Sequence, residues 1–556
     1  MGKHIEPLVA RNSFVRAVLA SSNARDHQER RRVVSNATIN QHSGEIVASK
    51  DVAAPKDAAA VILLRANGEA HAPEIFWARR GAELNFLPGC YAFPGGGREA
   101  SDFSTPILNA PDSETSAMIC CAARELFEEL GVMLAHGDLT PNKKEFASFV
   151  DDFHTGRLSF TELLERFNLH LDADDFTFAG RWVTPPFSPR RFDTWFFLVE
   201  CPADQEPRSL SSEFEEGEWI SATDALVRWQ RAERLVAPPV LHALKTLAAG
   251  MTDDLVERFL SVPHAHREPA RRIEFLSNFI CFPLRTPTHP PATYTNCYIV
   301  GGRELVVIDP ASPHEDEQAA LAAMIDKLLA EGRGVREIIL THHHPDHIGG
   351  VAALQSHLAA HGRVSVAAHR LTAGALEGVI RVDRLIEDSE MLHLDGDWPL
   401  HLRAMHTPGH ARGHLCFYEE RTGALITGDN VVGFGSVLID PREGDMRDYL
   451  ESLRKLRALP HVSVLLGGHG PVVGTPYAKI DEYIAHRLER ERSILAAVEM
   501  GASEPAEIVA RVYTDVPSRT HQMAESAVIS HLQKLETDGF VARGKDGRYI
   551  YTALAT

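Results

Sequence analysis

The stretch Thr341-His342-His343-His344-Pro345-Asp346-His347 decides the fold of the C-terminal half of this chain. From His342 it reads H-x-H-x-D-H, which places three imidazoles and one carboxylate within six residues. The run follows directly on Ile338–Leu340, an apolar segment with strand character. Packing gives no reason for so many polar side chains here, whereas a strand that ends in a tight loop can aim alternate side chains at two neighbouring metal ions. The stretch therefore predicts a dinuclear hydrolytic site.

Three further candidate ligands follow downstream, each beside a glycine: His410 in Thr407-Pro408-Gly409-His410, Asp429 in Thr427-Gly428-Asp429, and His469 in Gly467-Gly468-His469-Gly470. One consistent partition gives the first ion His342, His344 and His410, and the second Asp346, His347 and His469, with Asp429 as the bridge. Histidine and carboxylate ligands without cysteine favour two zinc ions, with iron or manganese as alternatives. A hydroxide held between the ions is the expected nucleophile, and we also assign Asp346 a catalytic role.

Other polar residues near these motifs have expected roles outside the metal shell. Asp309 ends a predicted strand and is a candidate acceptor that orients a ligand imidazole. His343, His406 and His414 lie beside ligands, and we expect them to be hydrogen-bonded rather than metal-bound.

Composition narrows the class of protein. The chain has 556 residues, too many for one core, and its formal net charge of −19 disfavours non-specific attraction to nucleic acid or to an anionic membrane. No apolar stretch approaches the roughly 20 residues of a membrane span, so no membrane partner is expected. The seven cysteines are odd in number and scattered, which fits reduced thiols in a cytoplasmic protein.

The chain divides into four expected segments. Residues 1–51 are predicted to form a disordered tail rather than a transit peptide, because they contain acidic residues. Residues 52–262 show a mixed α/β pattern, and the stretch Met251–Arg272 reads as a linker. Residues 271–487 alternate strands and helices around the histidine motifs. Residues 488–556 are mostly helical and end in a predicted hairpin, which reads as a winged helix.

Residues 271–487 resemble the metallo-β-lactamase superfamily, which implies an αββα sandwich whose ligands lie at loop ends. All seven ligand positions of that family are filled. The main zinc lactamases carry Cys where this chain has Asp429, and the di-iron redox branch carries Glu where this chain has His344, so the resemblance favours hydrolysis of a thioester or a phosphodiester. Thr341–Gly350 and Thr407–His414 resemble glyoxalase II, whereas the winged helix resembles the β-lactamase-like endoribonucleases.

A second motif lies on a predicted helix in the first half: Arg124-Glu125-Leu126-Phe127-Glu128-Glu129-Leu130-Gly131-Val132. Its glutamates Glu125, Glu128 and Glu129 stand at i, i+3 and i+4, which share one helix face. Adjacent carboxylates repel unless a divalent cation neutralises them, and Mg²⁺ or Mn²⁺ suits such ligands. We therefore expect these three glutamates to bind a metal ion, and we assign Glu128 and Glu129 to catalysis.

This motif resembles the second half of the Nudix box, which implies an α/β/α sandwich with diphosphate hydrolase activity. The family pattern has a Glu eight residues before the Arg, where this chain has Ser116. About 13 residues are inserted between Gly97 and Arg124 relative to that pattern. An interrupted box of this kind is similar to the coenzyme A diphosphatase branch.

The resulting expectation is a bifunctional metal-dependent hydrolase. The Nudix part would cleave a coenzyme A-type or other nucleoside diphosphate derivative, and the dinuclear part would cleave a second bond in a small molecule, a thioester first. The alternative is an endoribonuclease-like metallo-hydrolase that acts on RNA, with a non-catalytic nucleotide-binding Nudix module. Residues 503–556 hold six basic and seven acidic side chains, which favours a structural role for the winged helix. The sequence predicts no particular oligomeric state.

Overall fold

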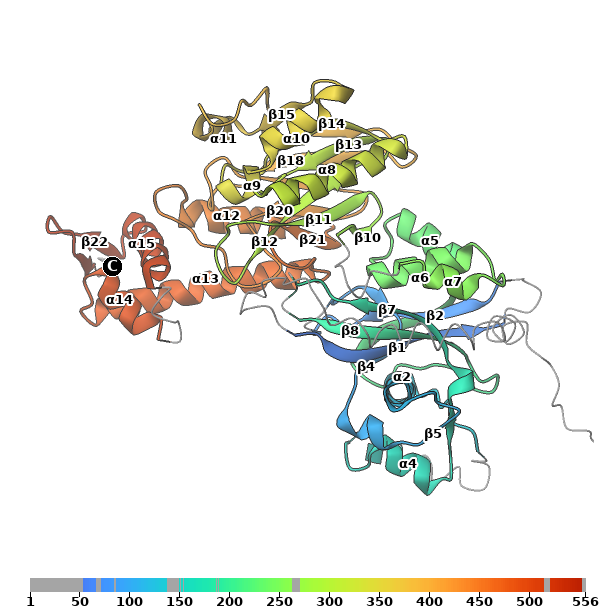
Figure 1. Cartoon of the computed structure of the whole chain (residues 1–556). Helices are drawn as coiled ribbons and strands as arrows, with labels where there is room; N and C mark the ends of the chain where they lie inside the picture. The colour runs from blue at the N-terminus through green and yellow to red at the C-terminus, as the bar shows by residue number, and fades with distance from the viewer. Residues whose placement is uncertain are drawn as a thin grey trace, which may run out of the picture. The chain divides into compact units, whose positions relative to one another are not determined.

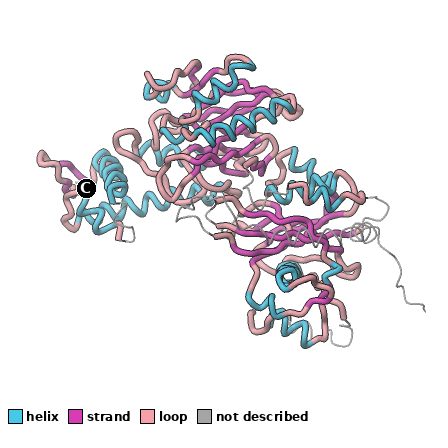
Figure 2. The backbone as a smooth tube through the Cα atoms, viewed as in Figure 1, coloured by secondary structure: helices cyan, strands magenta, loops and turns pink. Residues whose placement is uncertain are grey.

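The computed structural model describes residues 54–66, 72–84, 87–137, 150, 152–153, 155–186, 188, 190–262, 271–514 and 521–552. The expected N-terminal tail, residues 1–51, lies outside this set. The chain separates into two compact units, residues 1–270 and 271–556, and each is described by itself. Both units are mixed α/β structures (Figure 1, Figure 2).

The first unit is built on one seven-stranded sheet. Its central strand β1 (Lys56–Arg65) pairs in parallel with β8 (Phe192–Glu200) and antiparallel with β2 (Glu74–Arg80). The path β3-β2-β1-β8-β7 is completed by β4, which pairs with β1, and β9, which pairs with β2. The other strands of this unit are β3 (Tyr91–Ala92), β4 (Gly95–Gly97), β7 (Thr177–Val183) and β9 (Phe214–Ser221), with the short pair β5 (Ile107–Leu108) and β6 (Leu171–Asp172) outside the sheet.

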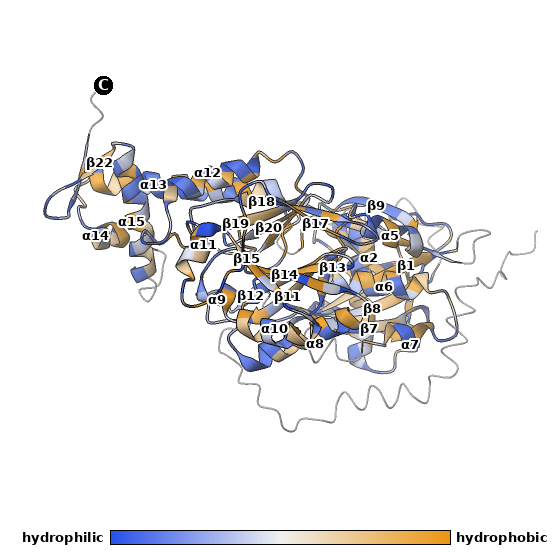
Figure 3. Cartoon of the chain, turned by 90° about the horizontal axis from the view of Figure 1, so that it is seen from above, coloured by the Kyte–Doolittle hydropathy of each residue, from blue (hydrophilic) through white to orange (hydrophobic). Residues whose placement is uncertain are grey.

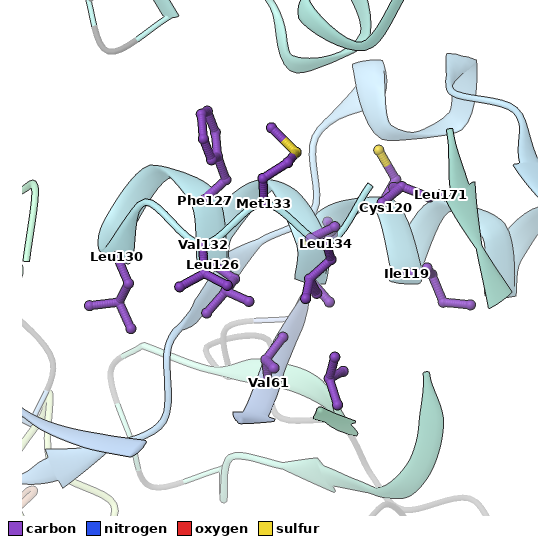
Figure 4. Packing of buried hydrophobic residues seen from close by; sticks show 14 of the residues in the cluster. Val61, Ile119, Cys120, Leu126, Phe127, Leu130, Val132, Met133, Leu134 and Leu171 are labelled. Atoms are coloured by element: carbon purple, nitrogen blue, oxygen red, sulfur yellow. The ribbon is translucent and has the colours of Figure 1, made fainter. Parts of the chain in front are cut away.

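Helix α2 (Ser113–Leu130) carries the glutamate motif and packs on this sheet. It begins at Asp112, whose carboxylate accepts a hydrogen bond from the Thr115 amide at 2.7 Å, and ends at Gly131, where φ is 70°. Its apolar face, including Leu126 and Leu130, meets Val61 of β1 in a buried cluster (Figure 4). Of the three glutamates, Glu128 is the most exposed, whereas Glu129 is buried.

Among the described residues of the first unit, the other helices are short: α4 (Phe160–Arg166), α5 (Ala222–Gln230), α6 (Pro238–Ala248) and α7 (Leu255–Phe259), with 3₁₀ turns at Ala100–Ser104 and Ala173–Asp175. Figure 1 shows α2 on one face of the sheet and α5 and α6 on the other, the expected α/β/α sandwich. Helix α7 lies inside the stretch read as a linker. Its Leu255 and Phe259 are buried, so this part of the stretch belongs to the folded unit.

The second unit contains two large sheets and, near its C-terminal end, a two-stranded hairpin. The first runs in the order β10 to β16, antiparallel from β10 to β13 and parallel from β13 to β16. The second runs from β17 to β21, with a parallel pair at β20 and β21. Bounds are β10 (Ile273–Leu276), β11 (Phe279–Arg285), β12 (Tyr294–Val300), β13 (Glu304–Ile308), β14 (Gly334–Ile339), β15 (Ser365–Ala368), β16 (Arg384–Leu385), β17 (Met391–Leu394), β18 (Leu400–His406), β19 (Leu415–Glu419), β20 (Ala424–Gly428) and β21 (Val464–Gly467).

Helices cover the outer face of each sheet. One apolar cluster joins α8 (Glu315–Ala330) and α10 (Val351–Leu358) to the first sheet, and another joins α12 (Met446–Arg457) and α13 (Pro476–Glu499) to the second. Both hydrophilic and hydrophobic residues occur along α8 and α10, as amphipathic helices require (Figure 3). Alternate strand residues such as Ile308 and Phe417 are buried on the inner faces. These layers confirm the expected αββα sandwich.

The C-terminal part is a small winged-helix domain. Helices α14 (Pro505–Val512) and α15 (His521–Thr537) and the hairpin of β22 (Val541–Arg543) and β23 (Tyr549–Tyr551) share a core with the end of α13. Because α13 runs unbroken from residue 476 to 499, the boundary expected at residue 488 falls inside a helix. The winged helix is therefore joined to the sandwich by a rigid element.

All seven cysteines are buried and none forms a disulfide. Within the described ranges we find no helix with the length and hydropathy of a membrane span.

Candidate functional site

The predicted metal ligands come together at the carboxyl ends of four strands. His342 and His344 follow β14, and Asp346 and His347 lie on the short helix α9 (Pro345–Ile348). The other three ligands come from the loop after β18 and from the ends of β20 and β21: His410, Asp429 and His469. Residues up to 127 positions apart (342 to 469) thus meet at one edge of the sandwich.

One cluster consists of three imidazoles. Nδ1 of His344 lies 2.9 Å from Nε2 of His342 and 3.0 Å from Nε2 of His410. The three ring nitrogens converge on a common point, with all mutual distances within 4.8 Å. This is the set that the sequence assigned to the first ion.

A second cluster contains Asp346, His347 and His469, again with one ligand atom each within 4.8 Å of the others. The Asp429 carboxylate lies between the two clusters. Its Oδ2 is 3.3 Å from Nε2 of His469 and 3.6 Å from Nε2 of His410, and its Oδ1 is 3.4 Å from Nε2 of His347. Asp429 thus lies within 3.6 Å of a histidine from each cluster.

Unsatisfied polar atoms indicate that a cation belongs here. Nε2 of His347 and Oδ1 of Asp429 are buried and make no hydrogen bond. Such orphaned atoms are costly, by about 1–3 kcal/mol each, unless a ligand satisfies them. A nitrogen lone pair and a carboxylate oxygen directed at one space are the donors that a divalent transition metal prefers, so the residues fit a dinuclear metal site.

Glycine at position 468 makes room for this arrangement. A Cβ atom there would lie 2.4 Å from Oδ1 of Asp429 and 2.9 Å from Cε1 of His347. Any side chain would push the bridging carboxylate and a ligand imidazole apart. The glycine beside His469 in the sequence is explained by this contact.

The distal nitrogen of each ligand histidine has its own partner. Nδ1 of His347 lies 2.9 Å from Oδ2 of Asp309, the contact that was expected of Asp309. Nδ1 of His410 and Nδ1 of His469 donate to backbone carbonyls, those of Leu438 at 2.9 Å and Tyr294 at 2.8 Å. These bonds fix which ring nitrogen faces the metal site.

His344 depends on a residue that the sequence did not single out. Its Nε2 lies 2.9 Å from the carboxylate of Glu443, which leaves Nδ1 for the metal. Glu443 is 99 residues away in the chain, and no local pattern marks it. Only the folded loop before α12 brings it to the site.

Of the other three histidines, His406 and His414 are hydrogen-bonded as expected, whereas His343 lies in a further group of possible ligands with His344 and Glu443. His414 is buried, and its Nε2 accepts a hydrogen bond from the Asp429 amide at 3.1 Å. His406 donates from Nε2 to the Arg412 carbonyl at 2.9 Å. His343 lies 3.7 Å from the Glu443 carboxylate. The first two therefore support the loops that carry ligands.

Burial and charge set the protonation states of the metal-free cluster. Burial, reinforced by the neighbouring imidazoles, lowers the pKa of His410 to about 3 and holds that of His342 well below its usual range. Burial also disfavours protonation of His347, but the carboxylates of Asp429 and Asp309 outweigh it and raise its pKa. His342 and His410 are thus neutral and ready to ligate.

In the first unit, Arg124 is the centre of the Nudix-like motif. Its side chain is buried and donates to Asp102 at 3.0 and 3.2 Å, to Glu125 at 2.9 Å and to the Gly97 carbonyl at 2.8 Å. Asp102 therefore supplies the carboxylate that the family pattern placed at Ser116.

The three glutamates of α2 are arranged less compactly than the histidine site. Glu129 is buried, and its Oε2 accepts from the Gly95 amide at 2.8 Å while Oε1 makes no hydrogen bond. Burial raises the pKa of Glu125 to about 7, although Arg124 opposes this. Among the described residues, the triads with ligand atoms within 4.8 Å include none from α2. The buried free oxygen of Glu129 and the close approach of Gly96 to Glu125 nevertheless fit a cation.

Comparisons with known proteins support both halves. The family described as "Metallo-beta-lactamase superfamily" matches residues 290–469, the "Beta-lactamase associated winged helix domain" matches 505–548, and the "NUDT19 Nudix domain" matches 109–247. The chain is 31% identical over 332 residues to "Atrochrysone carboxyl ACP thioesterase AgnL7" of Paecilomyces divaricatus, covering 56% of this chain and 96% of that protein. It is 29% identical over 282 residues to "Beta-lactamase-like protein 2 homolog" of Caenorhabditis elegans, covering 50% and 89%.

Among solved structures, the chain is similar to a NUDIX hydrolase from Alicyclobacillus acidocaldarius, with 30% identity, a TM-score of 0.30, and coverage of 36% of this chain and 93% of that one. The family matches agree with the folds and with the metal-binding cluster described above. The chain belongs to the metallo-β-lactamase superfamily and is a metal-dependent hydrolase that carries a Nudix domain and an associated winged helix.

Proposed function

We propose that the αββα domain hydrolyses a thioester at a dinuclear zinc centre. The observation that carries this proposal is the approach of His342, His347, His410 and His469 to the carboxylate of Asp429, whose buried Oδ1 makes no hydrogen bond. The similarity to a protein named as an acyl-carrier-protein thioesterase supports the bond type. Iron or manganese in place of zinc would serve the same geometry.

Each residue of the site has a distinct task. His342, His344 and His410 would hold one ion, Asp346, His347 and His469 the other, and Asp429 both. Bound zinc lowers the pKa of water and polarises a carbonyl group. Asp309 and Glu443 keep their partner imidazoles in the ligating tautomer. The water oxygen would bond to the thioester carbon while Asp346 accepts a proton from the water; the C–S bond would then break, and the leaving thiolate would take that proton to give a thiol and a carboxylic acid.

We propose that the first unit hydrolyses the diphosphate of a nucleoside diphosphate derivative, with Mg²⁺ or Mn²⁺ held by Glu125, Glu128 and Glu129. The Arg124–Asp102 ion pair fixes the helix that presents them. An acyl-coenzyme A carries both a thioester and a diphosphate, so one small molecule would be a substrate for both domains.

The contacts of the basic side chains in the winged helix favour a small-molecule substrate over RNA. Arg548 forms an ion pair with Glu504 at 2.9 Å, and the Arg543 guanidinium lies 5.7 Å from the centre of the Tyr549 ring. Basic side chains engaged in this way are poor candidates for a phosphate-binding surface.

The test is mass spectrometry of acetyl-coenzyme A after incubation with the full chain, with Zn²⁺ and Mg²⁺ supplied separately. We expect free coenzyme A from the zinc-loaded protein and acetyl-phosphopantetheine from the magnesium-loaded protein. His410→Ala should abolish the first product alone and Glu128→Gln the second alone, so each variant is the control for the other. Intact substrate under every condition would refute the shared substrate, and cleavage of RNA that is lost in His410→Ala would establish the alternative.

A further inference from the structure

A short segment without regular secondary structure, residues 435–439, lies against the metal site. We name it the strap. The carbonyl of its fourth residue, Leu438, accepts the hydrogen bond from Nδ1 of His410 at 2.9 Å. A carbonyl can only accept, so His410 carries its proton on Nδ1 and presents the Nε2 lone pair to the site. The direction of the Leu438 carbonyl therefore controls a proposed metal ligand.

Helix α13 holds the strap on one side of Leu438. The Tyr483 hydroxyl lies 2.9 Å from the Gly435 carbonyl, and Nη2 of Arg487 donates to the Val437 carbonyl. Arg487 is only 4% exposed and its guanidinium lies 5.4 Å from the centre of the Tyr449 ring, so its position is itself fixed by packing.

The winged helix holds the strap on the other side. Oγ of Ser530, on α15, donates to the Ile439 carbonyl at 2.6 Å across 91 residues of sequence. Ser530 is 2% exposed and Ile439 is fully buried. Each peptide group is planar, and the carbonyl of Leu438 lies in the peptide plane between the planes that carry the Val437 and Ile439 carbonyls. Hydrogen bonds that hold these two outer carbonyls therefore restrict the orientation of the Leu438 carbonyl.

Further contacts bind the same region to the winged helix. Asp538, just after α15, forms ion pairs with Arg447 of α12 and with Lys534. The amide of Asp445, at the start of α12, donates to the Gly409 carbonyl at 2.9 Å, next to His410. The chain that links the strap to α12 also carries Glu443, the partner of His344. Two imidazoles of the first cluster thus depend on a segment that the winged helix supports.

We propose that Ser530 of the winged helix is a positioning residue for the metal site: by holding the Ile439 carbonyl it orients the Leu438 carbonyl and, through it, His410. This inference rests on the proposed dinuclear centre. The winged helix would then contribute to metal binding although none of its residues contacts the metal or the substrate.

The experiment compares the full-length protein with Ser530→Ala and Val528→Ala. Val528 lies on the same helix and is fully buried in the winged-helix core, so its truncation loosens this domain without removing the bond to the strap. Zinc affinity is measured by competition with a chromophoric chelator, and the ligand field by the visible spectrum of the Co²⁺-loaded protein. We expect Ser530→Ala to weaken one of two zinc ions by about tenfold and to alter the Co²⁺ bands. Val528→Ala should leave both readouts as in the wild type.

Equal zinc affinities and spectra in Ser530→Ala and wild type would overturn the inference. So would an equal loss in Val528→Ala, because general loosening of the winged helix would then explain it. A wild-type protein that binds no zinc would instead overturn the proposed metal centre, which the same titration detects before any variant is examined.

Discussion

Replacement of Asp102 by Ala tests how the interrupted Nudix motif is held together. The carboxylate forms a buried ion pair with Arg124, with side chains 1% and 6% exposed. Removing one partner of such a pair costs about 3–5 kcal/mol. Because Arg124 keeps Glu125 and the Gly97 carbonyl, we expect the lower end, about 3 kcal/mol. For a domain of 150–250 residues this lowers the melting temperature by about 6–12 °C.

The assay is differential scanning calorimetry of the full chain, in which the transition of residues 271–556 serves as an internal reference. Asp112→Ala is the matched control, because it removes an exposed helix cap on the same helix and should cost only about 1 kcal/mol. A second variant adds Ser116→Glu to Asp102→Ala. Eight residues of helix separate Ser116 from Arg124 by about 12 Å, so the added carboxylate should not restore stability.

Two results would refute this reasoning. The first is an Asp102→Ala shift no larger than that of Asp112→Ala. The second is recovery in the Asp102→Ala, Ser116→Glu double variant, which would return the role to the position named by the family pattern.

Three further outcomes are expected. In Asp309→Asn the new residue tolerates the φ of 52° at this position but lacks the negative charge. The zinc affinity of one site, measured by competition with a chelator, should fall about 10–100-fold. An unchanged zinc affinity would contradict this prediction. Burial lowers the pKa of His369 from 6.5 to about 4, so as the pH falls the unfolded chain binds this proton before the folded chain does, and the contribution of neutral His369 to stability is lost between pH 6.5 and pH 4. In His369→Asn the melting temperature should therefore fall less steeply over this pH range than in the wild type. Parallel plots of melting temperature against pH for the two proteins would count against this. Gly409→Ala would place a Cβ atom 2.2 Å from Cα of Tyr449 and should give insoluble protein when a cell lysate is fractionated. The control Gly374→Ala adds its Cβ atom to open space and should stay soluble. Equal solubility of the two variants would speak against the clash.

The elements that could be predicted from the sequence are those determined by residues close together in the chain. The apolar run before His342 and the helix of Glu125 were predicted because periodicity and motif spacing are carried by neighbouring residues. Asp309 was found because it ends a strand. The carbonyl of Leu438 and the carboxylate of Glu443 could not be found in this way, since 28 and 99 residues separate them from their imidazole partners. A backbone carbonyl is present at every residue, so the amino-acid sequence does not show which one accepts a particular hydrogen bond.

The unbroken helix α13 was missed for a related reason. The residues that tie its first half to the sandwich, Tyr483 and Arg487, are polar, and read as surface until their partners are known. Asp102 was overlooked because it lies 22 residues before Arg124, and no local pattern links the two. In both cases the pairing is tertiary, and only the folded chain brings the partners together.

The burial of every cysteine has a practical consequence for enzymology. Burial raises the pKa of all seven thiols, that of Cys90 to about 12, so the reactive thiolate form is scarce at neutral pH. A thiol-reactive chromophore added to the native protein should therefore stay colourless until a reaction releases a thiol. Thioester cleavage can be followed continuously in the cuvette, with the enzyme itself contributing almost no background.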